Sequence, residues 1–394
     1  MLKIIKNGEV YAPEYLGKKD ILIADRRIGF IHDEIPLPSG LGDIEVMDAG
    51  SKIVVPGFID SHVHICGGGG EGSFSTRTPE IQLSDITTAG VTTVVGCLGT
   101  DGTTRCMAGL LAKARGLEEE GITTYIYTGS YQVPVVTITG SCRDDIVLIE
   151  KVIGVGEVAI SDHRSSQPTV DEIARIASEA RVGGMLAGKC GVVNLHLGDG
   201  CRRLEYLIKI LDNTEIPATQ FLPTHLNRDV GLLESSLEFA LRGGYVDLTT
   251  SSDPDALEER EVSASCGFRK MLEWGFPPER ITFSSDGQGS LPLFDREGKL
   301  IGLGIGSVKS LHRAFCASVF EEKIPIESAL RVITSNVADV LKMREKGRIN
   351  TGMDADIVIL NKEDLSIDMV IGKGKILVEN GKACVRGTFE KFDK

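Results

Sequence analysis

Two histidines one residue apart, His62 and His64, directly follow an apolar run at residues 53–60. Alternate side chains of a β-strand share one face, so both imidazole rings can point a nitrogen at one metal ion. Such a pair also occurs by chance on surface strands. Three further apolar runs, however, each end in a lone histidine or aspartate, namely His196, His225 and Asp286. The repeated position predicts that the five side chains meet.

Strand-like and helical segments alternate through the middle of the chain. Eight apolar, β-rich runs are expected strands: residues 53–62, 91–98, 122–128, 155–161, 192–197, 219–225, 245–250 and 281–286. Helical periodicity occurs at residues 104–120, 170–181, 232–242 and 257–274. This α/β alternation favours a closed (β/α)₈ TIM-type barrel over an open doubly wound sheet, and no G-x-G-x-x-G motif supports the open sheet. In such barrels the reactive side chains follow the carboxyl ends of strands, where all five candidates fall.

The two chain ends differ from the middle and resemble each other. Both alternate short strands with turns, and Asn380-Gly381 is a strong hairpin turn signal. Neither end is long enough to bury a core alone. We therefore predict one small β-sandwich domain from residues 1–56 and 345–394, beside a catalytic barrel at residues 57–344.

Composition excludes several classes of function. With 43 basic and 56 acidic residues, the formal net charge is 43 − 56 = −13, which opposes binding to nucleic acid. The polar start and the lack of an apolar run of ~20 residues predict a cytoplasmic protein with no membrane partner. Nine cysteines without a C-x-x-C pair fit reduced thiols. Cys66 lies close enough to the histidine pair to be a ligand, but a small buried residue is the preferred interpretation.

Four imidazoles and a carboxylate suit Zn²⁺ and are more ligands than one tetrahedral site uses. We therefore expect two Zn²⁺ ions per subunit, with a single ion as the alternative. Two ions need a bridging anion, and a bridging hydroxide would serve as nucleophile at neutral pH. For each histidine taken alone, the competing interpretation is a hydrogen-bonded core residue.

At these residues the chain resembles the amidohydrolase superfamily and, more closely, bacterial isoaspartyl (β-aspartyl) dipeptidases. The likeness runs nearly end to end and is most specific at residues 56–71, 99–101, 159–165, 223–228 and 284–290. It implies metal-dependent hydrolysis of β-aspartyl dipeptides by a protein that assembles into a homo-oligomer. His62 and His64 would hold the more buried metal, His196 and His225 the more exposed one, and Asp286 would be both ligand and proton shuttle.

One position departs from the dipeptidase pattern. Those enzymes carry on strand four a lysine whose carbamylated side chain bridges the metals, whereas Glu157 stands at the matching position here. The glutamate keeps one negative charge and two oxygens. Its carboxyl carbon, however, lies three atoms nearer the backbone than that of the carbamate, a difference of roughly 4 Å judged from bond lengths of about 1.5 Å. Strand four must therefore come closer, or Glu157 touches only one ion.

The resemblance also implies the residues that bind substrate. Arg164 and Arg228 would bind carboxylates through their guanidinium forks, and Glu71 would face the ammonium. Tyr131 would also contact the substrate, and further polar contacts would come from Gly69, Thr100 and Ser290. The catalytic residues would be Asp286, Tyr131 and Glu71. Tyr131 would polarise the scissile carbonyl. The alternatives are that Arg164 pairs with Asp162, that Glu71 is solvated and that Tyr131 is a packed aromatic.

Two rival functions remain on sequence grounds. Another amidohydrolase acting on cyclic amides or N-acyl amino acids would share the metal site but not the two arginines and Glu71. A non-catalytic scaffold on the same fold would hold no metal.

Overall fold

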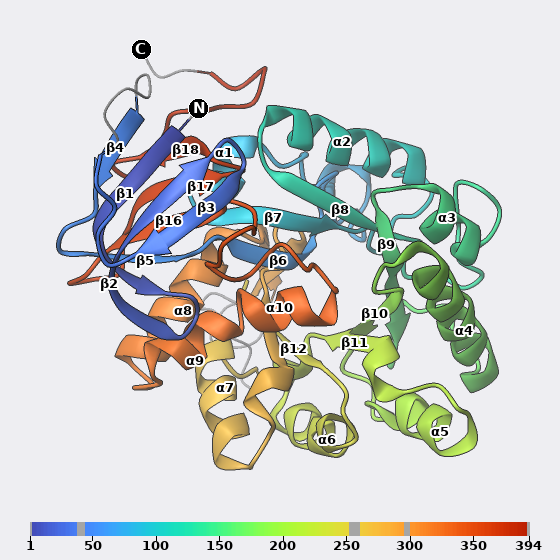
Figure 1. Cartoon of the computed structure of the whole chain (residues 1–394). Coiled ribbons are helices and arrows are strands. Elements are labelled where there is room, and N and C mark those ends of the chain that lie inside the picture. Colours follow the sequence, from blue (N-terminus) through green and yellow to red (C-terminus); the bar gives the residue numbers. More distant parts are fainter. Residues whose placement is uncertain (1, 38–43, 252–260, 295–299, 392–394) are drawn as a thin grey trace.

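The structure is a computed structural model that describes residues 2–37, 44–251, 261–294 and 300–391. Two parts lie side by side in it (Figure 1). A strand-rich part is built from the two ends of the chain, and an α/β part is built from the middle.

Eight parallel strands follow one another around the α/β part. Six form one sheet in chain order: β6 (Phe58–Val63), β7 (Val91–Gly96), β8 (Thr123–Thr128), β9 (Val152–Ile160), β10 (Val192–Leu197) and β11 (Phe221–Thr224). β12 (Val246–Thr249) and β13 (Ile281–Ser284) form a parallel pair, with β11 beside β12 and β13 beside β6. Beyond the ends of β6 and β13, the backbone N–H of His64 donates to the carbonyl of Gly287 at 2.9 Å. The predicted barrel fold is confirmed.

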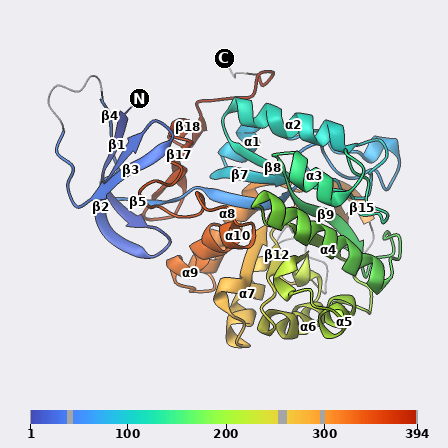
Figure 2. The same ribbon diagram turned by 45° about the vertical axis from the view of Figure 1, so that its right-hand side comes forward.

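Helices cover the outside of the barrel (Figure 2). They are α1 (Leu83–Thr87), α2 (Met107–Glu120), α3 (Cys142–Leu148), α4 (Val170–Ala187), α5 (Glu205–Asn213), α6 (Val230–Leu241), α7 (Ala264–Glu273), α8 (Lys309–Phe320) and α9 (Ile326–Arg331). The short helix α10 (Ser335–Val340) instead lies across one end of the barrel (Figure 1). The longest, α4, begins at a capping box of Thr169 and Glu172 and ends at Gly188, whose φ is +67°. Part of the helix expected at residues 257–274 lies outside the described residues.

Both chain ends contribute to one nine-stranded sheet. Its strands are β1 (Leu2–Tyr11), β2 (Tyr15–Ala24), β3 (Arg27–His32), β4 (Ile44–Asp48) and β5 (Lys52–Pro56) from the first end, with β16 (Ile357–Asn361), β17 (Ile367–Gly372), β18 (Lys375–Glu379) and β19 (Lys382–Ala383) from the second. The antiparallel pair β5–β16 joins the ends. Ile5, Ile21, Ile359 and Ile371 pack in a core of their own. The exact domain boundaries stay a prediction.

The apolar run at residues 53–62 is two strands rather than the one expected. β5 belongs to the sheet of the chain ends, and β6 is the first barrel strand. The chain passes from one to the other at Gly57, where a Cβ atom would lie 2.2 Å from Oγ1 of Thr92. Only glycine fits so close a contact. The residues on both sides of Gly57 are apolar, so the sequence shows no break at the change of sheet.

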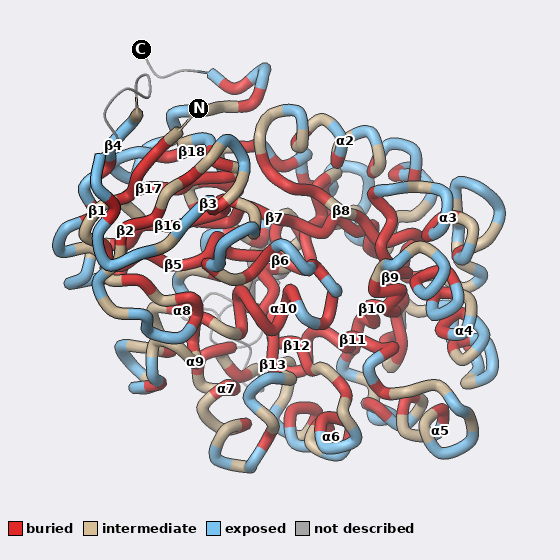
Figure 3. Tube along the Cα trace, viewed as in Figure 1, coloured by how far each residue is buried: buried red, intermediate tan, exposed pale blue. Residues whose placement is uncertain are grey.

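The inner strands are buried, whereas the outer faces of the helices are exposed (Figure 3). A hairpin of β14 (Ser290–Phe294) and β15 (Leu300–Ile305) follows β13. Within the described part of the chain, every helix is too short or too polar to cross a lipid bilayer.

Candidate metal centre and substrate pocket

Glu157 on β9 lies at the centre of a cluster of buried histidines. Its side chain is fully buried, and its two oxygens face different histidines. Oε2 lies 3.2 Å from Nε2 of His62 and 3.8 Å from Nε2 of His64. Oε1 lies 2.7 Å from Nδ1 of His196 and 3.1 Å from Nε2 of His225. One carboxylate therefore spans two pairs of histidines.

Asp286 completes the first half of this cluster. Its Oδ1 lies 3.0 Å from Nε2 of His64 and 3.7 Å from Nε2 of His62. Asp286 is the second residue after β13, and its φ of +52° is a left-handed conformation that is costly for most residues. His225, directly after β11, has a φ of +63°. The two turns thus aim their side chains inward at the ends of their strands.

The cluster has the chemistry of a divalent cation site. Among the described residues, Nε2 of His62, Oε2 of Glu157 and Oδ1 of Asp286 are buried atoms without a hydrogen-bond partner. Buried polar atoms are rarely left unpaired, and here they converge. Two sets of atoms within metal-binding distance of one another share Glu157: one with His62, His64 and Cys97, the other with His196 and His225.

Metal binding requires deprotonated ligands, and the pKa shifts of Glu157 and His225 favour that state. The pKa values of His62 and His64 are raised instead, because Cys97, with Glu157 or Asp286 beside it, outweighs the effect of burial. Burial by itself would raise the pKa of Glu157, but His62 and His196 lower it well below its ordinary value. Burial, together with the charge of His196, lowers the pKa of His225 to about 3. The carboxylate is therefore ionised and His225 is neutral at pH 7.

A β-bulge brings Glu157 into this position. The pairing of β9 with β10 is regular up to Val155 opposite Val193, and it resumes with Val158 opposite Leu195. Two residues of β9, Gly156 and Glu157, thus face one residue of β10. A Cβ atom on Gly156 would lie 2.9 Å from Cβ of Asn194, so glycine permits the close approach. Bulges often re-aim a side chain next to an active site.

Each histidine also has a partner on its other ring nitrogen. Nδ1 of His62 lies 3.1 Å from Oδ1 of Asn194, and Nδ1 of His64 lies 3.8 Å from Sγ of Cys97. In the second half of the cluster, Nε2 of His196 lies 2.9 Å from Oδ2 of Asp162, and Nδ1 of His225 lies 2.6 Å from Oγ1 of Thr249. Such partners fix the ring orientation of metal-binding histidines. The sequence analysis missed all four as site residues. Cys97, Asp162 and Thr249 lie at or just after strand ends, which is their only signal, whereas Asn194 lies inside β10.

Arg164 and Glu71 lie together beside the second half of the cluster. Arg164 pairs with Asp162, with Nη2 at 2.8 Å from Oδ2, as one interpretation of the sequence allowed. Its Nη1 remains directed at Oε1 of Glu71, 3.5 Å away. The same Glu71 oxygen accepts a hydrogen bond from the Thr100 hydroxyl at 2.8 Å. Glu71 is therefore held by two side chains, although it is exposed.

Tyr131 and Arg228 face the same region. The Tyr131 hydroxyl is 2.8 Å from Nδ1 of His196, and its side chain is buried beneath the guanidinium of Arg164, whose Cζ is 5.4 Å from the ring centre. Nη1 of Arg228 is 4.0 Å from Oδ2 of Asp162. The two arginines thus converge on one carboxylate next to the histidine cluster.

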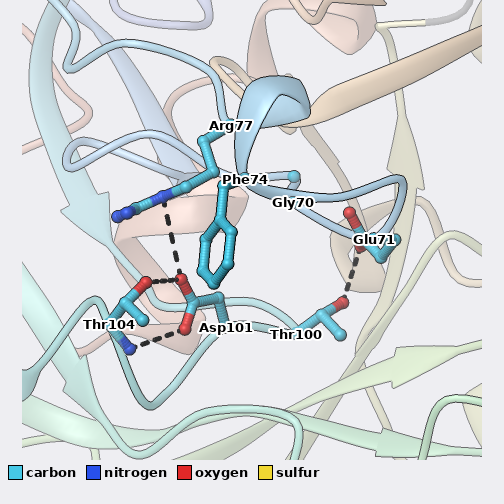
Figure 4. Close-up of a pocket in the computed structure, with 8 residues that line it drawn as sticks. Gly70, Glu71, Phe74, Arg77, Thr100, Asp101 and Thr104 are labelled. Carbon is cyan, nitrogen blue, oxygen red and sulfur yellow. Dashed lines mark hydrogen bonds and ion pairs between the residues drawn. The ribbon is translucent and has the colours of Figure 1, made fainter.

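A cavity of about 260 Å³ opens beside Glu71 and Thr100 (Figure 4). The exposed ring of Phe74 and the side chains of Arg77 and Asp101 form its other walls. Gly69 also lines it, and a Cβ atom there would lie 2.9 Å from Cβ of Ser290. Tyr131, Arg164 and Arg228 thus lie beside the histidine cluster, whereas Gly69, Glu71 and Thr100 line this cavity, which Arg164 approaches through Glu71. The individual roles of these residues and of Ser290 stay predictions. Cys66 is not part of the cluster; Cys97 is the cysteine beside it.

The model of the amidohydrolase family matches residues 53–377, most of the chain. The chain belongs to the amidohydrolase family. A solved relative is similar to this amidohydrolase over nearly its whole length: the β-aspartyl dipeptidase of the thermophilic keratin degrader Fervidobacterium islandicum AW-1, in complex with the β-Asp-Leu dipeptide. The TM-score is 0.88 at 48% sequence identity, covering 97% of this chain and 98% of that one. The resemblance inferred from sequence is confirmed.

More distant relatives share less. A D-hydantoinase structure covers the full length of this chain with a TM-score of 0.70 but only 19% identity, and it therefore supports the fold alone. The dihydroorotase of Listeria monocytogenes serotype 4a is 44% identical over 69 residues, a match that spans only 15% of that enzyme's own length.

Proposed function

We propose that this amidohydrolase hydrolyses β-aspartyl dipeptides with the help of two Zn²⁺ ions. The observation that carries the proposal is the placement of Glu157, whose two oxygens face separate pairs of histidines next to two arginines. The similarity to a β-aspartyl dipeptidase with bound β-Asp-Leu supports the same substrate class.

In this proposal Glu157 serves both metal sites. One oxygen, with His62, His64 and Asp286, would hold the first ion, and the other, with His196 and His225, would hold the second. The bound ions would lower the pKa of water to make a nucleophile and would polarise the scissile carbonyl. Imidazole and carboxylate ligands suit Zn²⁺.

The substrate carries two carboxylates and one ammonium group, and the pocket offers matching charges. Arg164 and Arg228 converge beside His196, so together they suit the carboxylate of the leaving residue. Glu71, held by Thr100, would face the α-ammonium. Gly69 and Ser290, which adjoin each other, would contact the neighbouring α-carboxylate.

Two side chains would act directly on the reacting atoms. Burial would raise the pKa of Asp286, but the hydrogen bond from His64 lowers it, so the side chain is a carboxylate that can accept the proton of the attacking water. It would then deliver that proton to the leaving amine, because an amide anion leaves poorly. Burial and the charge of Glu157 raise the pKa of Tyr131 well above its usual value, so its hydroxyl stays a donor for the developing oxyanion.

The test compares substrates on one preparation. Zinc-loaded protein is assayed with β-Asp-Leu, α-Asp-Leu, a hydantoin and an N-acetyl amino acid, and again after removal of metal with a chelator. We expect turnover of β-Asp-Leu alone and its loss without metal. Preferential hydrolysis of the hydantoin or the N-acetyl amino acid would identify a different amidohydrolase activity. Protein that holds no metal and turns over none of the four would support the scaffold.

We further propose a cytoplasmic location, a homo-oligomeric assembly and the domain division at residues 1–56 with 345–394 and 57–344. All nine cysteines lie within the described residues and are free, which suits a reducing compartment. The exposed apolar side chains of Leu148, Met185 and Leu186 on α3 and α4 suit contact with another subunit. Size-exclusion chromatography with light scattering tests the assembly.

A further inference from the structure

Asp162 is a buried carboxylate that contacts one of the proposed metal-binding histidines and both arginines of the proposed substrate site. Its side chain is only 2% exposed. Oδ1 accepts hydrogen bonds from the backbone N–H and Nε of Arg164 at 2.7 and 3.0 Å, and Oδ2 accepts one from Nη2 at 2.8 Å. Oδ2 also lies 2.9 Å from Nε2 of His196 and 4.0 Å from Nη1 of Arg228. The exposed ring of His163 is 3.6 Å from Oδ1.

The turn that carries Asp162 is fixed by the loop after the next strand. A Cβ atom on Gly198 would lie 2.5 Å from Cβ of Asp162, and one on Gly200 would lie 2.5 Å from the carbonyl oxygen of Ser161. Nε2 of Gln167 donates a hydrogen bond to the carbonyl of Asp162 at 2.9 Å. The carboxylate therefore sits on backbone with little room to move, as a residue that orients others requires.

The contact with Asp162 fixes the orientation of the His196 ring. Nε2 of His196 lies 2.9 Å from Oδ2 of Asp162, and the same nitrogen lies 3.1 Å from Nη2 of Arg164. With Nε2 held on this side, Nδ1 is the nitrogen that faces Oε1 of Glu157 at 2.7 Å. Asp162 thus turns the metal-binding nitrogen toward the cluster and holds the ring there.

The contact with Arg164 fixes the plane of a guanidinium group. Two parallel hydrogen bonds to one carboxylate leave the group little rotational freedom. The single negative charge of Asp162 also lies between Arg164 and Arg228, which would otherwise repel each other. The arginine pair can therefore stay close enough together to grip one substrate carboxylate.

We infer that Asp162 is a positioning residue that ties the His196 metal ligand to the two carboxylate-binding arginines. The inference rests on the proposed function and deepens it. One side chain would set both the affinity of the second metal site and the affinity for the leaving residue of the dipeptide, although it touches neither ligand.

The test measures both affinities in Asp162→Asn. The amide keeps the size of the side chain but loses the charge and one acceptor oxygen. Metal-free protein is titrated with Zn²⁺ against a chromophoric chelator, and KM for β-Asp-Leu is measured at saturating Zn²⁺. The matched control is Asp20→Asn, which alters an equally buried carboxylate that pairs with Lys6 in the sheet of the chain ends. If Asp162→Asn does not accumulate as folded protein, Asp162→Ser replaces it.

We expect Asp162→Asn to weaken one of the two Zn²⁺ sites, the one held by His196, about 10- to 100-fold and to leave the other unchanged. KM should rise about tenfold or more, because charge-assisted hydrogen bonds hold Arg164 in place. Asp20→Asn should change neither quantity, since distant sites act independently. If both Zn²⁺ affinities or KM stay at the wild-type values, the inference is wrong. If wild-type protein fails to hydrolyse β-Asp-Leu, the proposed function fails, and the Zn²⁺ titration still tests the effect on His196.

Discussion

Replacement of Gly156 by alanine probes the β-bulge that presents Glu157. A Cβ atom at this position would lie 2.9 Å from Cβ and 3.0 Å from the carbonyl oxygen of Asn194. Non-bonded carbon atoms pack best at about 3.5 to 4.0 Å, so β9 and β10 must separate by about 0.6 Å or more. Overpacking of this kind costs about 1–3 kcal/mol of folding free energy.

The same displacement disturbs the metal centre from two directions. It moves Glu157, whose oxygens lie 2.7 Å from His196 and 3.2 Å from His62. It also pushes Asn194, which holds the other ring nitrogen of His62 at 3.1 Å. Since a lost supporting contact typically weakens metal binding about 10- to 100-fold, we expect Gly156→Ala to lower Zn²⁺ affinity by at least that factor.

The assay combines urea unfolding of the metal-free protein with a competitive Zn²⁺ titration. Gly116→Ala in α2 is the matched control, because a Cβ atom there meets no atom within 4 Å. An alanine inside a helix should stabilise the protein by about 0.5–1 kcal/mol and leave Zn²⁺ affinity unchanged. If the urea midpoint and the Zn²⁺ affinity of Gly156→Ala both equal those of wild type, the bulge does not position Glu157 as we argue.

Three other substitutions test separate parts of the account. Tyr131→Phe should lower kcat about 10²- to 10³-fold with a much smaller change in KM, because the hydroxyl stabilises only the developing oxyanion. Steady-state kinetics with β-Asp-Leu measure both constants. An unchanged kcat would exclude Tyr131 from the chemical step. Arg164→Lys keeps the charge but loses the paired hydrogen bonds to Asp162, so KM should rise about 10- to 100-fold, and a wild-type KM would contradict its role. Burial would raise the pKa of Asp20, but Lys6 lowers it below the unfolded value of about 3.9, so its stabilisation is full above that pH and disappears as pH falls through the folded pKa. Asp20→Asn should therefore lower the urea midpoint at pH 7, and the gap to wild type should narrow as the pH falls below about 3.9. A gap that stays constant through this acid range would refute the assignment.

The metal-binding side chains were predictable because of their position relative to the barrel strands. His62, His196, His225 and Asp286 all lie at or just after the carboxyl ends of parallel strands, and these ends meet on one face of any such barrel. Their residue types then indicate the chemistry. No knowledge of side-chain packing is needed for this step.

The role of Glu157 was harder to foresee for a physical reason. Its side chain is too short to bridge two sites from a regular strand, and the sequence alone left open whether it touches one ion or two. The register shift at Gly156 solves the problem of reach, and it depends on the pairing of β9 with β10. A glycine before a glutamate does not by itself reveal a bulge.

The residues behind the histidines were missed for a related reason. Asn194 contacts His62, and Thr249 contacts His225, although each pair is far apart in sequence. Such contacts depend on the relative register of neighbouring strands, which local patterns do not encode. The division of the apolar run at Gly57 into two strands was also hidden, because both strands are equally apolar.

The most direct test of the central claim is a crystal structure of Zn²⁺-loaded protein with anomalous diffraction recorded at the zinc edge. The account predicts two anomalous peaks, with Oε2 of Glu157 bound to the ion held by His62 and His64, and Oε1 bound to the ion held by His196 and His225. A single ion that takes both oxygens of Glu157, or peaks that leave Glu157 uncoordinated, would contradict it.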